Sequence, residues 1–412
     1  MRAFGAALRP RGARRFFLAH AQSSLGSGIA IVGLPLLAYD HYRTPWALTA
    51  VLLCELLPAV ALGPLLGALA DRLPRRTALV AADVLRLGAF GALALVPSLA
   101  LMIVCALVAG IGSALFNPSA LASVSQLATA RHRPAAMSLY SALDDLGLTL
   151  GPALAGALLL VIDPHVLMAV NAATFTLSAG LLATIPLSAP VRRAAGSLFA
   201  SMRAGTREIV ALPGVRLLLG SSTVAVVAVG MVNVGEVLLA RELLGVGGSG
   251  LAALMTASGV GTFLGSTFGA RTNMTWQWRR AYIAGLMCMA ADLVLCAIAP
   301  HFWLLVVTFA LGGFGNGLAL VHDRLLLAHT VPEPLHGRLF AIHKTCTSAA
   351  FVLAFVLAGA LISTLGIQAM FLVGGLALMV IIVVVRPPLR ALWPEPAAEP
   401  AAQALRPRAG TT

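Results

Sequence analysis

The chain has 412 residues, of which 59% are hydrophobic and only 10% are charged, whereas about 25% of the residues in an average globular protein are charged. A mean hydropathy of +0.93 excludes a water-soluble protein of this size. The formal charge is +13, but the 28 basic residues are sparse and separated by long apolar runs, which excludes a nucleic-acid-binding surface. The composition predicts an all-α integral membrane protein.

Apolar stretches of the length needed to cross a bilayer, about 20 residues, recur along the chain. The first follows a basic N-terminal segment and is too long for a cleaved signal sequence. We expect twelve transmembrane helices, at 16–39, 46–69, 77–97, 99–126, 135–161, 165–186, 216–239, 250–270, 281–299, 302–322, 338–362 and 367–386.

The longest polar interruption lies between the sixth and seventh stretches and divides the chain into two halves. Weak matches such as Gly112 with Gly312, 200 residues apart, suggest that a six-helix unit has been duplicated. We expect a cytoplasmic N-terminal segment at 1–15, a six-helix bundle at 16–186, a cytoplasmic linker at 187–215, a second six-helix bundle at 216–386, and a disordered cytoplasmic tail rich in Pro and Ala at 387–412.

The distribution of basic residues predicts the orientation in the membrane. If the N-terminus is cytoplasmic and the segments alternate, every basic residue except Arg43, Arg86 and Arg241 falls on the cytoplasmic side or in the cytoplasmic end of a segment. Such an asymmetry is the mark of cytoplasmic loops. We therefore expect both termini in the cytoplasm of a bacterial cell and a multi-pass protein in its inner (plasma) membrane.

The most specific local motif is GALADRLPRR at 67–76, in the turn between the second and third segments. Its small residues allow two helices to approach closely, and its charges can cap a helix, pair across a seam or contact anionic lipid. The motif residues are Gly67, Asp71, Arg72, Arg75 and Arg76. The motif resembles the signature of the major facilitator superfamily, with Pro74 in place of the usual Gly. The resemblance implies two six-helix bundles and a motif that gates the cytoplasmic seam.

Two further segments refine the resemblance. The sequence PEPLHGR at 332–338 is similar to a segment of bacterial macrolide-efflux and enterobactin exporters. In the fifth segment, Gly147, Gly151 and Gly156 lie on one helix face with Pro152, and this stripe is similar to the antiporter motif of exporting family members. The resemblance implies efflux. The alternative for the stripe is simple close packing of helices.

Placing a charged side chain inside a membrane costs free energy, so each charged residue within the apolar segments indicates a structural or functional role. Asp83 and Arg86 lie three residues apart on one helix face and are predicted to form a structural pair. By contrast, Asp144, Asp145, Glu236 and Glu55 have no basic partner at helical spacing.

Such carboxyl groups are best tolerated in the protonated form, which makes Asp144, Asp145, Glu236 and Glu55 candidate proton carriers. The alternative is structural hydrogen bonding. Asp292, in the middle of the ninth segment, occupies a position that in this fold usually faces lipid or scaffold.

Neutral polar residues within the segments are candidates for a substrate cavity, or else for hydrogen bonds between helices. They are Gln22, Ser27, Asn233 and Asn316. The chain has no phosphate-binding loop with Lys, no catalytic triad pattern and no metal-ligand spacing among its five cysteines. We therefore expect no catalytic residues, no metal and no cofactor.

These observations predict a secondary active transporter that exports a lipophilic small molecule, such as a drug, an antibiotic or a siderophore-like compound, by proton antiport and alternating access. Its partners would be the substrate, protons and the lipid bilayer, with no nucleic acid, and we expect a monomer. Two alternatives stay open, an uptake symporter for a small metabolite and a membrane receptor or scaffold that does not transport.

Overall fold

The computed structural model describes residues 10–70, 72–95, 98–129, 132–187, 209–246, 248–298, 301–332 and 335–394. Within these residues, all regular structure is helical. The elements are α2 (Arg11–Tyr42), α3 (Pro45–Ala61), α4 (Gly63–Ala70), α5 (Arg75–Leu95), α6 (Leu99–Leu127), α7 (Arg133–Leu158), α8 (Pro164–Ala183), α10 (Pro213–Leu238), the π-helix η1 (Leu239–Leu243), α11 (Gly248–Gly269), α12 (Thr275–Ile298), α13 (Phe302–Thr330), α14 (His336–Leu365) and α15 (Ile367–Leu392). Nine of the described helices are long and apolar enough to cross a membrane.

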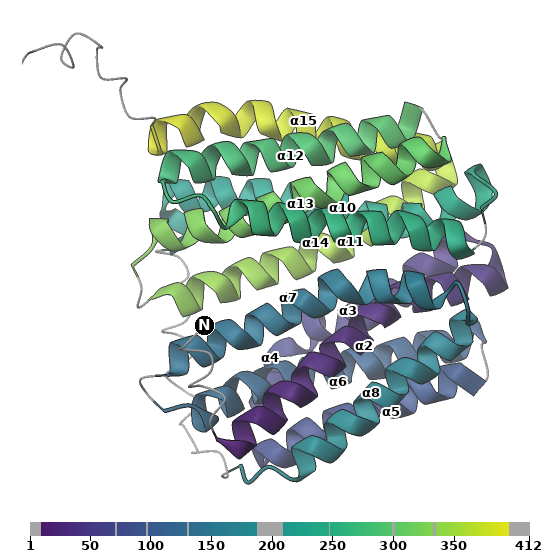
Figure 1. Ribbon diagram of the computed structural model, residues 1–412, viewed down its shortest axis with the longest axis vertical. Helices are drawn as coiled ribbons and strands as arrows, with labels where there is room; N and C mark the ends of the chain where they lie inside the picture. Colours follow the sequence, from purple (N-terminus) through teal and green to yellow (C-terminus); the bar gives the residue numbers. More distant parts are fainter. Residues whose placement is uncertain are drawn as a thin grey trace, which may run out of the picture.

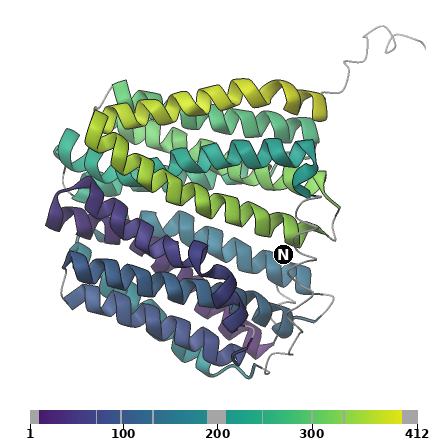
Figure 2. The ribbon, with the colours of Figure 1, turned by 180° about the vertical axis from the view of Figure 1, so that it is seen from behind.

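The helices gather in two groups that lie side by side. In Figure 1, α2 to α8 form the lower group and α10 to α15 the upper group, and Figure 2 shows the same division from behind. Across the division, α7 packs against α11 and α3 packs against α14. At the second contact the Thr49 hydroxyl donates to the Phe355 carbonyl at 3.4 Å.

Several helices extend beyond the predicted apolar segments. Helix α2 begins at Arg11, so its first turn lies within the predicted N-terminal segment 1–15. Helix α10 begins at Pro213, whose fixed φ suits the first helical position, so the last residues of the predicted linker 187–215 are helical. Hydropathy indicates only the apolar part of a helix. Backbone hydrogen bonding continues into the polar turns on either side, so the helix is longer than its apolar part.

The second predicted segment, 46–69, is interrupted in the structure. Helix α3 ends at Ala61 and α4 begins at Gly63, with Leu62 between them. Pro58 and Pro64 lack the N–H groups that would continue the helical hydrogen bonds through this region.

The predicted disordered tail 387–412 is wrong in its first residues. Helix α15 continues through Pro387 and Pro388 to Leu392. The side chains of Leu389 and Trp393 are buried in the hydrophobic core, and this packing holds the last turns in spite of the two prolines. Residues 395–412 lie outside the described residues, as do 188–208 of the linker.

The matched glycines Gly112 and Gly312 occupy equivalent places in the two groups. A β-carbon at Gly112, on α6, would lie 2.8 Å from Cγ of Arg86 on α5. A β-carbon at Gly312, on α13, would lie 2.6 Å from Cγ of Asp292 on α12. In each half, therefore, a glycine leaves room for a charged side chain of the preceding helix.

Large apolar side chains are exposed on the outer faces of the helices. Trp303 is 77% exposed, and Val380, Val383 and Val384 expose one side of α15. Exposed apolar side chains of this kind suit contact with lipid and are unfavourable in water.

Candidate functional site

A cavity of about 80 Å³ lies within the second group of helices. We call it the acid cavity. Its lining comes from α10, α11, α12 and α13 and consists of Ala228, Val229, Val232, Asn233, Glu236, Ser258, Met289, Asp292, Leu293, Phe309, Gly312, Gly313 and Asn316.

The helical repeat explains why these residues line one space. On α10, Val229, Val232, Asn233 and Glu236 recur every three or four residues and therefore share a face. On α13, Gly313 lies against the backbone of Ser258 on α11, where a β-carbon would be 2.8 Å from the Ser258 carbonyl carbon. The absence of side chains there lets α13 approach its neighbours and leaves the polar groups around a small common space.

Two carboxyl groups face the acid cavity. Glu236 is 8% exposed and Asp292 is 7% exposed, and each is within electrostatic range of the other. The Cys296 thiol donates to Oδ1 of Asp292 at 3.4 Å, and its sulfur lies 3.5 Å from the Thr308 hydroxyl. Glu236 forms no hydrogen bond with any described residue.

The structure corrects the expected position of Asp292. The sequence favours a lipid or scaffold role, but its side chain is buried and lines the same cavity as Glu236, Asn233 and Asn316. Glu236 and Asp292 lie on different helices and are far apart along the chain, so no local sequence pattern indicates that they line the same cavity.

The remaining acidic candidates lie in the first group of helices. Asp144, on α7, is half-buried and interacts electrostatically with His20 of α2 and with Tyr140. His20 stacks on the Tyr140 ring with centroids 4.0 Å apart. Glu55 is half-buried on α3, away from the acid cavity, and the side chain of Asp145 lies outside the described residues. Sequence reasoning did not single out His20, which is 120 residues from Tyr140.

Asp83 and Arg86 interact as the sequence predicts. Arg86 donates to the Asp83 carboxylate, and both side chains are buried. The Arg86 guanidinium also lies between the rings of Phe116 and Phe175, 4.4 Å from each centroid. Asp83 is therefore paired with a positive charge, and Arg86 makes cation–π contacts with two aromatic rings in addition to this ion pair.

Two of the predicted cavity residues are engaged elsewhere. The Gln22 amide donates to the Thr174 carbonyl of α8 at 2.7 Å, and the Ser27 hydroxyl donates to the Ser23 carbonyl at 3.0 Å. Both contacts lie within the first group of helices. Of the four predicted cavity residues, Asn233 and Asn316 line the acid cavity.

The glycine stripe of α7 contacts α2. A β-carbon at Gly147 would lie 2.6 Å from Cβ of Ser24, and one at Gly151 would lie 2.6 Å from the carbonyl carbon of Gly28. Gly156 is buried and Pro152 is half-buried on the same helix. Gly147 and Gly151 therefore pack closely against α2 within one group, and the antiporter role of the stripe stays a prediction.

Replacement of Gly151 by alanine is expected to destabilise the protein, because the added methyl group meets the α2 backbone. Overpacking of this kind costs about 1–3 kcal/mol. Gly180→Ala is the matched control, since no atom lies within 4 Å of its added β-carbon. Thermal unfolding in detergent tests the difference, and equal midpoints for the two variants would contradict the packing.

The predicted gating motif joins α4 to α5. The Arg75 guanidinium donates to the Ala122 carbonyl of α6 at 2.6 Å, Arg72 and Arg76 are exposed, and Gly67 has open space beside it. Asp71 lies outside the described residues.

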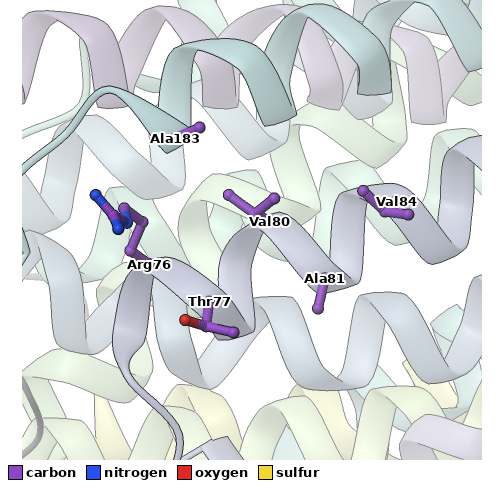
Figure 3. A pocket seen from close by; sticks show the side chains of 6 residues that line it. All are labelled: Arg76, Thr77, Val80, Ala81, Val84 and Ala183. Carbon is purple, nitrogen blue, oxygen red and sulfur yellow. The ribbon is translucent and has the colours of Figure 1, made fainter.

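A hollow of about 430 Å³ begins beside this motif. Figure 3 shows Arg76 and Thr77 at one end of it, the α5 side chains Val80, Ala81 and Val84 along it, and Ala183 of α8 beside it. Val84 is exposed on the outer face, so the hollow belongs to the surface that meets lipid rather than to an interior site.

Polar contacts join the two groups at the C-terminal end of α2. Arg241 of η1 donates to the Asp40 carboxylate at 2.9 Å, and the Tyr39 hydroxyl donates to the Glu242 carboxylate at 2.7 Å. We call these the distal contacts. Sequence reasoning missed them because each connects residues about 200 positions apart.

Comparisons with known proteins agree on one family. A model of the Major Facilitator Superfamily matches residues 16–239 and 218–410. The uncharacterized MFS-type transporter YfiS of Bacillus subtilis (strain 168) is 27% identical over 372 residues, which cover 87% of this chain and 88% of that protein. The multidrug efflux pump Tap of Mycolicibacterium fortuitum is 27% identical over 389 residues, which cover 89% of this chain and 93% of that protein.

The fold is also similar to that of solved transporters. The nucleoside transporter NupG superposes with a TM-score of 0.71 at 12% sequence identity, over 92% of this chain and 99% of that chain. At this level of identity the likeness concerns the fold alone.

Proposed function

Because this chain belongs to the Major Facilitator Superfamily, and is therefore a membrane transporter and not an enzyme, we propose that it exports a lipophilic small molecule by proton antiport. The substrate class would be a drug, an antibiotic or a siderophore-like compound. The similarity to the multidrug efflux pump Tap supports the direction and the substrate class.

The observation that carries the proposal is the environment of Glu236. Its carboxyl group is buried, lines the acid cavity and has no hydrogen-bond partner among the described residues. A carboxyl group in such a place is most stable when protonated, and ionisation requires water to reach it. Opening toward one side of the membrane and then the other would let Glu236 take up and release a proton.

The transport unit in this proposal is one chain in the bacterial plasma membrane, with twelve transmembrane helices and both termini in the cytoplasm. The two bundles, 16–186 and 216–386, would rock against each other about a site near the midplane. The motif at 67–76 would gate the cytoplasmic seam, and the distal contacts would close the opposite end in the state described.

A panel of lipophilic compounds tests the proposal. The full chain is expressed in a bacterial host that lacks its own efflux transporters, and retention of each compound is measured with and without an uncoupler. We expect lower retention of at least one compound, and loss of that effect with the uncoupler. Accumulation of the compound in cells, or export that survives the uncoupler, would contradict proton-driven efflux.

A further inference from the structure

The hollow beside α5 and α8 changes in chemical character along its length. Its polar end is formed by Arg76 and Thr77, in the first turn of α5. The rest of its lining is apolar and consists of Val80, Ala81 and Val84 of α5 and Ala183 of α8 (Figure 3). A ligand that fills the hollow therefore needs one polar end and an apolar body.

The polar end of the hollow is positively charged. Arg76 is exposed, and so is Arg72 in the turn that precedes α5. Arg75, by contrast, is engaged within the protein, where it donates to the Ala122 carbonyl of α6. Within the described part of the chain, no acidic side chain lines the hollow. The polar end therefore suits an anion, and the positive end of the α5 helix dipole, which lies here, adds to this preference.

The apolar part of the hollow lies on the face of α5 that meets lipid. Thr77, Ala81, Val84 and Gly88 recur every three or four residues and therefore share this face. A β-carbon added at Gly88 would meet no atom within 4 Å, so the surface stays open one turn beyond Val84. From Thr77 to Gly88 the helix rises by about 16 Å. The hydrocarbon core of a bilayer is about 30 Å thick, so this length matches one leaflet.

These features distinguish between the possible occupants. A free inorganic anion would use only the polar end and leave the apolar part empty. A zwitterionic phospholipid carries a positive charge in its headgroup, which Arg72 and Arg76 repel. An anionic phospholipid fits both parts, because its phosphate is attracted to the arginines and its acyl chain is apolar.

We propose that the hollow between α5 and α8 binds one anionic phospholipid of the adjacent leaflet, with the phosphate at Arg76 and an acyl chain along Val80, Ala81 and Val84. Both helices belong to the first group, so the site does not depend on how the two groups are arranged. It is also independent of the substrate, the direction and the coupling ion of transport.

Lipid binding can be measured on the purified full chain in detergent by native mass spectrometry. Phosphatidylglycerol, which is anionic, and phosphatidylcholine, which is zwitterionic, are titrated with the same acyl chains. We expect one phosphatidylglycerol to bind more tightly than any phosphatidylcholine, and Arg76→Gln to weaken that binding about fivefold, the effect of one basic residue near a membrane surface. Arg216→Gln, which alters an exposed arginine in the first turn of α10, is the matched control and should keep the affinity.

A second variant tests the apolar part of the site. Ala81→Phe fills part of the hollow without changing its charge, and we expect it to weaken phosphatidylglycerol binding as well. If this variant does not fold, Val84→Phe at a 51% exposed position takes its place. Glycerol phosphate, which has the anionic group but no acyl chain, should not displace the lipid.

Three results would overturn the proposal. The first is equal affinity for the two lipids, and the second is unchanged phosphatidylglycerol binding in Arg76→Gln. The third is unchanged binding in the variants that fill the hollow, or displacement of the lipid by glycerol phosphate, since either would indicate a site for the anionic group alone. A dimer in the same spectra that Ala81→Phe disrupts would assign the hollow to a second copy of the chain and would also overturn it.

Discussion

Export driven by a proton gradient is expected to fall by at least about tenfold when Glu236 is replaced by glutamine, which corresponds to about 1.4 kcal/mol or more in the limiting step. The amide has nearly the same shape as the carboxyl group but cannot release a proton. Because Glu236 has no hydrogen-bond partner among the described residues, the variant should fold and still bind substrate. Initial export rates in proteoliposomes with an imposed pH gradient provide the measurement, and equilibrium binding of the same compound provides the comparison.

The control for this experiment is Asp163→Asn, an exposed carboxylate outside the interior, which should transport normally. The same assay ranks the other candidates, Asp144, Asp145 and Glu55. Normal transport by neutral variants at all four positions would show that none of them couples the proton.

The largest loss of stability is expected at Arg86. Arg86→Gln leaves the Asp83 carboxylate buried without its charged partner, and breaking a buried ion pair in this way costs about 3–5 kcal/mol. The variant also loses the guanidinium from between Phe116 and Phe175, where cation–π contacts contribute about 0.5–2 kcal/mol. Thermal and denaturant unfolding in detergent should show the effect.

Two further variants separate charge burial from general damage. Asp83→Asn combined with Arg86→Gln removes both charges and should recover part of the stability that Arg86→Gln loses. Arg216→Gln alters an exposed arginine in the first turn of α10 and should change stability by less than about 0.5 kcal/mol. If Arg86→Gln unfolds at the same midpoint as Arg216→Gln, the pair is not a structural element.

Features that depend on one segment could be predicted from the sequence. Hydropathy locates the helices because a spanning segment must be apolar along most of its length. The Asp83–Arg86 contact is also local, since residues three apart share a helix face. The motif at 67–76 was enough to identify the family.

Features that depend on how helices are rotated against one another could not be predicted. The sequence gives the depth of Asp292 along its segment, but each residue turns the side chain by about 100°, so the face it presents is set by packing. Part of that packing depends on Gly312 of α13, which leaves the space that the Asp292 side chain fills. His20 and Tyr140 meet for the same reason, as neighbours on α2 and α7 that are far apart along the chain.

The distal contacts also bear on how readily the molecule changes state. Asp40 and Arg241 keep 25% and 22% of their side-chain surface exposed, so water and salt weaken their attraction. An ion pair of this kind contributes about 0.2–1 kcal/mol, which alters the ratio of two conformational populations by only about 1.4- to 5-fold. In the proposed transport cycle this pair would therefore hold the two groups together only weakly, and a substrate that prefers the alternative conformation by a similar small margin would reverse the populations.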